Sequence, residues 1–540
     1  MEQKNGARPD ARDVIGGAWL ARELGIDLVQ QLYVESEIGR RRQTVHHTNQ
    51  RREVHQEQMR PAPTIPAHIT FLLKHEGVHL EFLARLFDRL PAKTLVDWVR
   101  SEPTGQYARR AGFLYEWITG KELDVESGLI GGAYVDALDP VDQLVAGQGV
   151  NIGRWRVRDN MPGSPDFCPT VRLTPAVRKA LEFDLTGALN KEEAEFGAEV
   201  LRRSAVWMTL RESRASFLIE GEQNQATRIQ RFASVMESRT GVGEIPLTPE
   251  SLAALQRNIL GDVTTLTSFG LRQSPVFVGE TIRYENVVHY VGPEWSDVPS
   301  MLGGLQAFMS RTQGASAAAR AAVASFAFVY IHPLADGNGR VHRFLVNDVL
   351  RRDGAIRPPF ILPISALITE HSAERAHYDE ALEAFSRPLM TRYADRYHFS
   401  RESHEQLDGV ESNFHFNAYA DARMAWRFID LTSHVEYAAG LLARTIEQEM
   451  HAQAAFFRSL GNARAWVKEI IEGPDADVDA IIRSARENGG TLTGKLAKRF
   501  PALRNGTAWD RVVAAVTVAF PSDLSADDDA PAQGHPRPMA

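Results

Sequence analysis

One stretch of twelve residues constrains this chain more than any other: His332-Pro333-Leu334-Ala335-Asp336-Gly337-Asn338-Gly339-Arg340-Val341-His342-Arg343. It follows an apolar run, residues 321–331, that contains no Gly or Pro and predicts a buried helix. Pro333 and the glycines break that helix, and apolar residues resume at helical spacing from Val341. We expect Asn338 to cap the new helix. The stretch therefore predicts a glycine-rich turn at a helix N-terminus, where backbone N–H groups and the helix dipole attract an anion.

The side chains of this turn suit phosphate chemistry. Arg340 and Arg343 are three residues apart, so they share a helix face and can bind phosphate oxygens. Asp336 offers the hard oxygen ligand that Mg²⁺ takes beside phosphates. His332 can act as a base near neutral pH. A capped turn with solvated charges is the alternative, but a base, a carboxylate, an anion-binding turn and two arginines together favour a catalytic site.

This stretch resembles the motif of the Fic family, H-x-F-x-[DE]-G-N-G-R-x-x-R, and departs from it at Leu334, where the family usually has Phe. The matching residues are His332, Asp336, Gly337, Asn338, Gly339, Arg340 and Arg343. The resemblance implies a protein adenylyltransferase in which residues 336–343, Val341 and His342 included, bind ATP. It further implies Mg²⁺ at Asp336 and His332 as the catalytic base. Leu334 is apolar too, so we expect it to anchor the loop in the core.

A second motif lies upstream. Ser216 and Glu220 are four residues apart, on one face of an expected helix, and Gly221 can end that helix. Taken alone, the pair is typical of a solvated helix. Ser216 to Gly221 also resembles the Fic inhibitory motif, [ST]-x-x-x-E-[GN], in the class that carries its inhibitory helix before the core. The resemblance implies that Glu220 pairs with Arg343, keeps it from the γ-phosphate of ATP and inhibits the enzyme.

Between residues 274 and 292 the apolar period changes to that of a β-hairpin. By resemblance this hairpin is the Fic flap, which aligns a target segment strand to strand; a hairpin without that role is the alternative. The expected flap residues are Arg283, Tyr284, Glu285, Asn286, Val287 and Val288. Tyr378 matches a family position near the adenine pocket, with a packed aromatic as the alternative.

The composition is that of a soluble globular protein with room for several domains. The chain has 540 residues, 44% hydrophobic and 24% charged, and a formal net charge of −8, which gives no general attraction to nucleic acid or membrane. Cys168 is the only cysteine, so no intrachain disulfide can form. No apolar run is long enough to span a membrane, and residues 1–10 lack the apolar core of a signal peptide. We expect a cytoplasmic protein.

The N-terminal region contains a stretch that formally matches the zinc motif H-E-x-x-H, His75-Glu76-Gly77-Val78-His79. The glycine inside it and the lack of a third ligand at the usual spacing favour an ordinary amphipathic helix. Residues 14–33 have helical spacing, and a basic patch between residues 40 and 55 is expected to be a solvated helix face, with a nucleic-acid surface as the alternative.

The expected fold class is all-α: a mainly helical Fic fold with a β-hairpin flap and additional helical N- and C-terminal regions. We expect a mostly helical N-terminal region with a loop-rich connector (1–174), an inhibitory helix region (175–245), the catalytic core (246–395), a C-terminal helical region with a winged-helix alternative (396–520) and a disordered tail (521–540). The C-terminal helices are expected to pack or to form a homodimer, with DNA binding as the alternative.

The sequence thus favours a nucleotidyltransferase that moves AMP from ATP, with Mg²⁺, to a Ser, Thr or Tyr hydroxyl of a target protein. Three alternatives stay open. One is removal of AMP from a protein, and another is transfer of a different phosphate-containing group at the same site. The third is a nucleotide-sensing regulator that binds DNA or a partner through its C-terminal helices.

Overall fold

The computed structural model describes residues 13–47, 50–221, 225–283 and 285–521. The described chain is mainly helical with a few small sheets, as the sequence predicted. It divides into two compact units, residues 1–186 with 209–445, and residues 187–208 with 446–540. Among the described helices, none is both long and apolar enough to cross a membrane.

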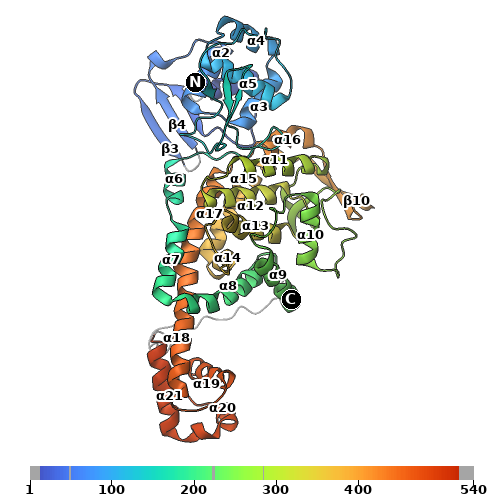
Figure 1. Ribbon diagram of the computed structural model, residues 1–540. Helices are drawn as coiled ribbons and strands as arrows, with labels where there is room; N and C mark the ends of the chain where they lie inside the picture. The colour runs from blue at the N-terminus through green and yellow to red at the C-terminus, as the bar shows by residue number, and fades with distance from the viewer. Residues whose placement is uncertain (1–12, 48–49, 222–224, 284, 522–540) are drawn as a thin grey trace, which may run out of the picture. The chain divides into compact units, whose positions relative to one another are not determined.

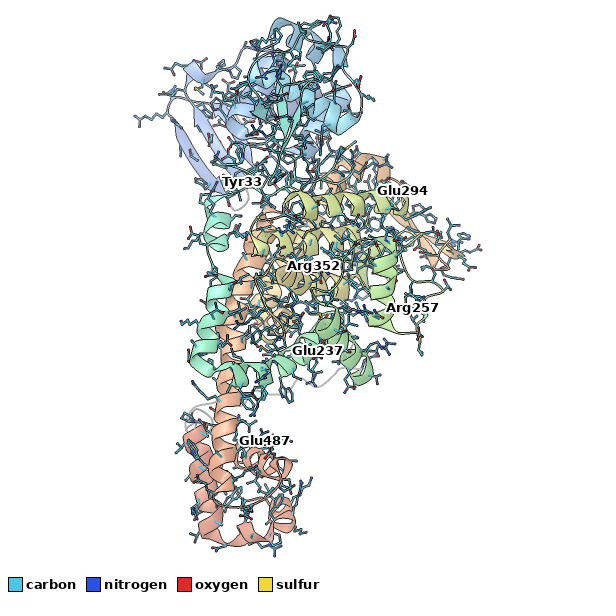
Figure 2. The ribbon with its side chains drawn as sticks, in the orientation of Figure 1. Tyr33, Glu237, Arg257, Glu294, Arg352 and Glu487 are labelled. Atoms are coloured by element: carbon cyan, nitrogen blue, oxygen red, sulfur yellow. The ribbon has the colours of Figure 1, made fainter. Side chains whose placement is uncertain are left out.

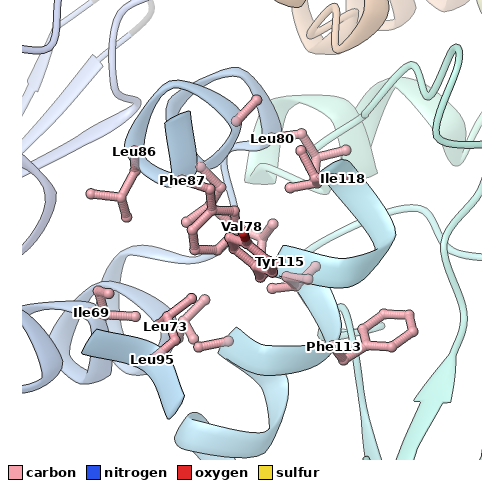
Figure 3. Close-up of a cluster of buried hydrophobic side chains, with 14 of the residues drawn as sticks. Ile69, Leu73, Val78, Leu80, Leu86, Phe87, Leu95, Phe113, Tyr115 and Ile118 are labelled. Carbon is pink, nitrogen blue, oxygen red and sulfur yellow. The ribbon is translucent and has the colours of Figure 1, made fainter. Parts of the chain in front are cut away.

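The N-terminal part of the first unit combines a helical cluster with a small sheet. Buried apolar side chains from its helices, among them Leu80, Phe87 and Tyr115, pack together in Figure 3. The sheet has the strand order β1-β2-β4-β3. The elements are β1 (Val14–Ile15), α1 (Gly16–Leu24), β2 (Val34–Ile38), β3 (Gln43–His47), β4 (Gln50–His55), α2 (Ile65–Phe71), α3 (Leu80–Arg89), α4 (Ala92–Ser101) and α5 (Gln106–Thr119).

Two predictions for this part are wrong. Residues 14–33 do not form one helix, because Gly25 takes a left-handed conformation (φ 61°) and ends α1. The basic patch of residues 40–55 is not a helix face, because most of it lies on the antiparallel strands β3 and β4, where Val45 faces Arg52. Arg52 is ion-paired with Glu37 of β2, so cross-strand pairing accounts for part of this charge.

The H-E-x-x-H stretch is used for local structure. Glu76 is half-buried, and its Oε2 accepts a hydrogen bond from the Gly17 N–H (2.8 Å). His79 Nδ1 accepts one from the Phe82 N–H (3.1 Å) and so caps α3. The ring of His75 packs against Phe71, 4.7 Å between centroids.

A loop-rich connector then leads to the upstream motif. It holds a three-stranded sheet and a helix that Thr174 caps, since the Thr174 side chain accepts a hydrogen bond from the Val177 N–H (3.1 Å). The elements are β5 (Val135–Asp136), β6 (Val150–Ile152), β7 (Val157–Asp159), α6 (Pro175–Leu181), α7 (Leu185–Phe196), α8 (Ala198–Ile219) and α9 (Ala226–Arg239).

The centre of the first unit is helix α12 (Ala317–Ile331), which is buried on nearly all sides and packs against α11, α13 and α17 (Figure 1). The apolar run predicted this burial. Arg352, labelled in Figure 2 at the end of α13, donates a hydrogen bond to the Gly243 carbonyl (2.6 Å) and ties α13 to the segment before α10. The helices are α10 (Pro249–Leu260), α11 (Val298–Arg311), α13 (Asn338–Arg352), α14 (Ile364–Glu370), α15 (Ser372–Arg392), α16 (Tyr419–Arg427) and α17 (Thr432–Arg444).

Two hairpins flank these helices. The predicted one is confirmed as β8 (Phe277–Ile282) and β9 (Glu285–Val291). The second, β10 (Tyr397–Glu405) with β11 (Glu411–Phe416), falls where the sequence predicted only helix. Its aromatic side chains explain the strands, because Phe399 and Phe414 pack on Phe277 of the first hairpin (ring centroids 5.2 and 4.8 Å apart).

The second unit has its own core, with Ile481, Val512 and Leu503 buried among other apolar side chains. Its described residues form helices and no strand, so the wing of a winged helix is not found there. The units divide at Thr445 and Ile446, not near residue 396, and α17 remains packed on α12. The remaining helices are α18 (His451–Lys468), α19 (Asp475–Glu487), α20 (Gly494–Arg499) and α21 (Gly506–Ala519), and most of the tail predicted to be disordered lies outside the described residues.

Candidate functional site

The site is the loop that joins α12 to α13. His332 ends α12 in a left-handed conformation (φ 49°, ψ 57°), which is unfavourable for a side chain with a Cβ. Gly337 supplies a second positive φ (92°) immediately before α13. The helix begins at Asn338, so its first-turn N–H groups face the loop without partners within the helix.

Asn338 closes the loop. The expectation that it caps the helix is wrong, because the capping position is Gly337. The Asn338 Oδ1 accepts a hydrogen bond from the Leu334 N–H (3.0 Å), and its Nδ2 donates one to the Leu334 carbonyl (2.7 Å). Leu334 itself is fully buried. Its apolar side chain and the amide of Asn338 therefore fix both sides of the turn.

Arg272 binds the backbone of the loop, a role that the sequence did not predict. Its buried guanidinium donates to the carbonyls of His332 (2.7 Å), Ser274 (2.8 Å) and Pro293 (2.6 Å), and its own N–H donates to the Pro333 carbonyl (2.9 Å). The first of these acceptors lies at the C-terminal end of α12, where the helix dipole favours a cation. Burial lowers the pKa of Arg272 to about 10, so it stays charged at neutral pH.

The imidazole of His332 is held in one tautomer. Nδ1 lies 3.1 Å from the Val329 carbonyl, and because a carbonyl can only accept, Nδ1 carries the proton and Nε2 keeps its lone pair. Burial and the nearby charge of Arg272 lower the pKa of His332 to about 4. The side chain is therefore a neutral base throughout the physiological pH range.

Asp336 lies at the exposed side of the turn. Its carboxylate is 3.2 Å from Arg340 Nη2, and its carbonyl accepts a hydrogen bond from the buried amide of Gln256 on α10 (2.8 Å). It borders an open cleft of about 480 Å³ that is also lined by Arg228, Leu260, Val263, Thr264 and Thr265. An exposed carboxylate beside a cleft of this size can take a divalent cation together with phosphate oxygens.

The two arginines of the loop meet one carboxylate. Glu220 Oε1 lies 2.5 Å from Arg343 Nη2, and Glu220 Oε2 lies 3.0 Å from Arg340 Nε. Both guanidinium groups are buried, and Arg340 Cζ lies 5.0 Å from the centroid of the Phe217 ring. The sequence suggested only the contact with Arg343, whereas the carboxylate bridges both arginines.

Ser216 completes the arrangement. Its hydroxyl accepts a hydrogen bond from Arg343 Nε (2.7 Å), and its carbonyl accepts one from Nη2 (3.0 Å). Helix α8 ends at Ile219, and Gly221 follows with a positive φ (74°). Ser216, Glu220 and Arg343 therefore form one buried, hydrogen-bonded group.

Gly339 shows how closely the carboxylate approaches the loop. A Cβ added at this position would lie 2.3 Å from Glu220 Oε1, which is closer than any real contact. A larger residue here would force the Glu220 carboxylate to shift, so Gly339 provides space and does not serve a positive φ. The carboxylate of Glu220 thus lies directly over the first turn of α13, where an anion is favoured.

Three further site residues are packed side chains of α13 and α15. Val341 is fully buried, and burial lowers the pKa of His342 to about 3, while its Nδ1 lies 2.7 Å from the Ser325 hydroxyl. The hydroxyl of Tyr378 is 3.5 Å from His342 Nε2, and its ring is buried beside Arg343. The packing that we considered for Tyr378 is present, and its role toward adenine stays a prediction.

The expected flap residues lie at the tip of the β8–β9 hairpin. Arg283 is exposed in the turn (φ 49°), Asn286 and Val287 are exposed on β9, and Val288 is buried. Glu285 begins β9, and Tyr284 lies outside the described residues. As a two-stranded ribbon, the hairpin has outer edges whose backbone groups can pair with an added strand.

The fold and the site define a helical protein with a preformed anion site at a loop–helix junction, next to a neutral histidine base. Residues 246–350 match the model of the Fic/DOC family. The protein adenylyltransferase Fic of Drosophila grimshawi is 31% identical to this chain over 124 residues, and that of Drosophila melanogaster is 29% identical over the same length. Each match covers 23% of this chain and 23% of the relative, so the chain spans about a quarter of the length of these curated relatives.

Solved structures give a similar but weaker comparison. A Fic family protein from Desulfovibrio desulfuricans is 18% identical with a TM-score of 0.33, covering 63% of this chain and 90% of that one. A Fic domain containing signaling protein from Bacteroides thetaiotaomicron is 17% identical with a TM-score of 0.34, covering 52% and 97%. TM-scores this low do not establish a common fold.

Proposed function

We propose that this protein is a nucleotidyltransferase that transfers AMP from ATP to a hydroxyl side chain of a target protein, and that Glu220 keeps it in an inhibited state. The observation that carries the proposal is the pair of buried arginines that hold one carboxylate over the glycine-rich turn. A carboxylate and a phosphate oxygen make equivalent partners for guanidinium groups. Arg340 and Arg343 would therefore bind the β- and γ-phosphates of ATP once Glu220 withdraws.

The reaction requires a base and in-line attack. The target hydroxyl oxygen attacks the α-phosphorus of ATP, its proton passes to Nε2 of His332, and the bond to the bridging oxygen breaks to release pyrophosphate. The N–H groups at the start of α13 stabilise the negative charge on the α-phosphate. Asp336 would hold Mg²⁺, which neutralises phosphate charge when bound. The hairpin edge would align the target segment.

Inhibition follows from competition for the same two cations. While Glu220 occupies Arg340 and Arg343, the γ-phosphate cannot reach Arg343 and ATP binds in an unproductive position. Like charges also repel, since the carboxylate lies where the phosphate would come.

The test uses two substitutions and ATP labelled in the α-phosphate. Glu220→Gly is expected to raise labelling of the protein itself or of target proteins at least ~10-fold, because one buried ion pair contributes a few kcal/mol. His332→Asn in the Glu220→Gly background should lower it by about 10²- to 10⁴-fold, the usual contribution of a general base. Asn is chosen because it tolerates the left-handed backbone at this position better than Ala.

Two results would contradict the proposal. Unchanged labelling in Glu220→Gly would mean that the carboxylate does not inhibit. Full labelling in His332→Asn would exclude the histidine as the base. Mass spectrometry of the labelled proteins would then identify the target and the modified hydroxyl.

Removal of AMP from a protein is a second candidate, and the partial exposure of Glu220 favours it. The side chain of Glu220 is 22% exposed, so water can reach a carboxylate that faces the anion site. Intact mass separates the two reactions, since transfer adds AMP and hydrolysis removes it. Glu220→Gly would increase the first and abolish the second.

A further inference from the structure

A second carboxylate on α8 is buried and has no part in the reaction described above. Glu212 lies one helical turn before Ser216, and its side chain is fully buried. Its Oε2 accepts a hydrogen bond from the Ser365 N–H (2.7 Å), and its Oε1 accepts one from the Ser365 hydroxyl (2.6 Å). Ser365 lies in the first turn of α14 and is also fully buried.

These two bonds join α8 to the core at a point separate from the arginines. Residues 212, 216 and 220 follow one another at intervals of four, so they lie along one face of the helix. At one end of that face Glu212 is bonded to α14, and at the other end Glu220 is bonded to α13. Arg343 is the charged group from another element that acts on Glu212.

Resting on the proposed inhibition by Glu220, we propose that Glu212 is a positioning residue that holds the second half of α8 against α14 and so keeps Glu220 on Arg340 and Arg343. Without the Glu212 carboxylate, the Ser365 N–H and hydroxyl stay buried without a partner whenever α8 is docked. Such a loss costs enough to shift the docking equilibrium by about 5- to 150-fold toward the released helix.

The test compares three substitutions with Glu220→Gly as reference. Glu212→Ala should raise labelling from ATP by about 5- to 150-fold, up to the rate of Glu220→Gly. Glu212→Gln should stay inhibited, because its amide oxygen can accept from the Ser365 N–H and its NH₂ can donate to the hydroxyl oxygen. Glu199→Ala, at an exposed position in the first half of α8 where Glu199 pairs with Arg202 and Arg203, is the matched control and should behave as the unaltered protein.

Amide hydrogen exchange gives a readout that does not depend on activity. Glu212→Ala should exchange faster at residues 213–221, while Glu212→Gln and Glu199→Ala keep the original protection. Should Glu212→Ala fail to fold, as judged by circular dichroism and thermal unfolding, Ser365→Ala replaces it, because it removes one of the same two hydrogen bonds. In the Glu220→Gly background, Glu212→Ala should add no further activation.

The pH dependence of inhibition is a third readout. Burial raises the pKa of Glu212 to about 7, whereas the released helix would return it toward its ordinary value of 4.5. The protonated form therefore favours docking, and docking weakens as the pH rises from about 5 to about 7. Arg343, the charged group that acts on Glu212, keeps its charge over that range because arginine does not titrate there. The labelling ratio of unaltered protein to Glu220→Gly should rise with pH, and in Glu212→Gln it should not.

The outcomes separate this inference from the function on which it rests. Activation by Glu220→Gly without any change in Glu212→Ala overturns the inference and leaves the function standing. If Glu220→Gly does not activate, the proposed inhibition fails, and faster exchange in Glu212→Ala decides alone whether Glu212 positions the helix. Faster exchange supports that role, and unchanged exchange overturns it.

Discussion

At the scale of single residues, His332 shows how the loop sets the chemistry of a side chain. Its strained backbone, the Val329 carbonyl and the nearby Arg272 together fix a neutral imidazole with Nε2 free. A histidine in water would be partly protonated at pH 6.5 and could not act as a base in that form. Burial removes the protonated form near neutral pH, and the lowered pKa makes the imidazole a weaker base.

The rate of the released enzyme should therefore show no inflection near pH 6.5. Because the pKa of His332 is lowered to about 4, the neutral form is present above that value, and activity is lost only as the pH falls through it. The measurement is labelling by Glu220→Gly between pH 5 and pH 8, where inhibition is absent. A rate that falls by half near pH 6.5 would show that the imidazole is more exposed in the active state.

At the scale of elements, the loop and the helix before it depend on Arg272. Helix α12 ends next to the His332 carbonyl. Among the described contacts, this carbonyl accepts a hydrogen bond only from the Arg272 guanidinium. The same side chain binds Ser274 and Pro293, which flank the hairpin. One cation thus aligns the loop that carries His332 with the base of the β8–β9 hairpin.

Arg272→Met should destabilise the protein by about 3 kcal/mol, because several buried carbonyls lose their donor. It should also lower labelling in the Glu220→Gly background, since His332 would no longer be fixed. Arg257→Met is a suitable control, because Arg257 is exposed on α10 and its guanidinium only covers the ring of Phe269, 4.9 Å away. Chemical denaturation and labelling of both variants check this. Equal stability of the two would mean that the carbonyls find other donors.

Local sequence signals predicted the elements whose cause is local. The helix before the loop follows from its apolar run. Thr174 and Thr248, the N-caps of α6 and α10, are of a residue type favoured at that position, and each precedes a proline. The hairpin at residues 277–291 follows from its alternation. The sequence did not predict strands β3 and β4 or the hairpin at residues 397–416. Their stability comes from cross-strand contacts, and the sequence pattern does not show which residues are partners.

The site was predictable where its residues are close together in the sequence. The twelve-residue stretch places a histidine, a carboxylate and two arginines together by chain continuity, so the sequence is sufficient to propose them. Arg272 and Gln256 reach the loop, and Glu212 reaches α14, from distant segments, and each is a single polar residue among ordinary neighbours in the sequence. Only tertiary packing distinguishes such residues from solvated ones.

At the scale of the whole molecule, the separate hydrophobic core of the second unit predicts that this unit unfolds in an event of its own. The second unit buries Ile481, Leu503 and Val512 in a cluster of its own. Units with independent cores commonly unfold in separate transitions.

Ile481→Ala should lower the free energy of unfolding of the second unit by about 2 to 5 kcal/mol, since it removes buried methyl groups, and should leave the other transition unchanged. Val518→Ala is the control, because Val518 is 68% exposed in the same unit. Differential scanning calorimetry of both variants measures the effect. A single transition that shifts as a whole would mean that the units unfold cooperatively.

Under the proposed inhibition, the bridge from one carboxylate to two arginines makes Glu220 and the phosphates of ATP competitors for the same two cations. Glu220 is a ligand tethered to its own binding site, and its strength is an effective concentration set by how rigidly α8 is held. Any change that loosens the tether lowers this concentration, and rising ATP then displaces the carboxylate more easily. A cell could therefore adjust the activity continuously, through the apparent affinity for ATP, without any change in the catalytic groups.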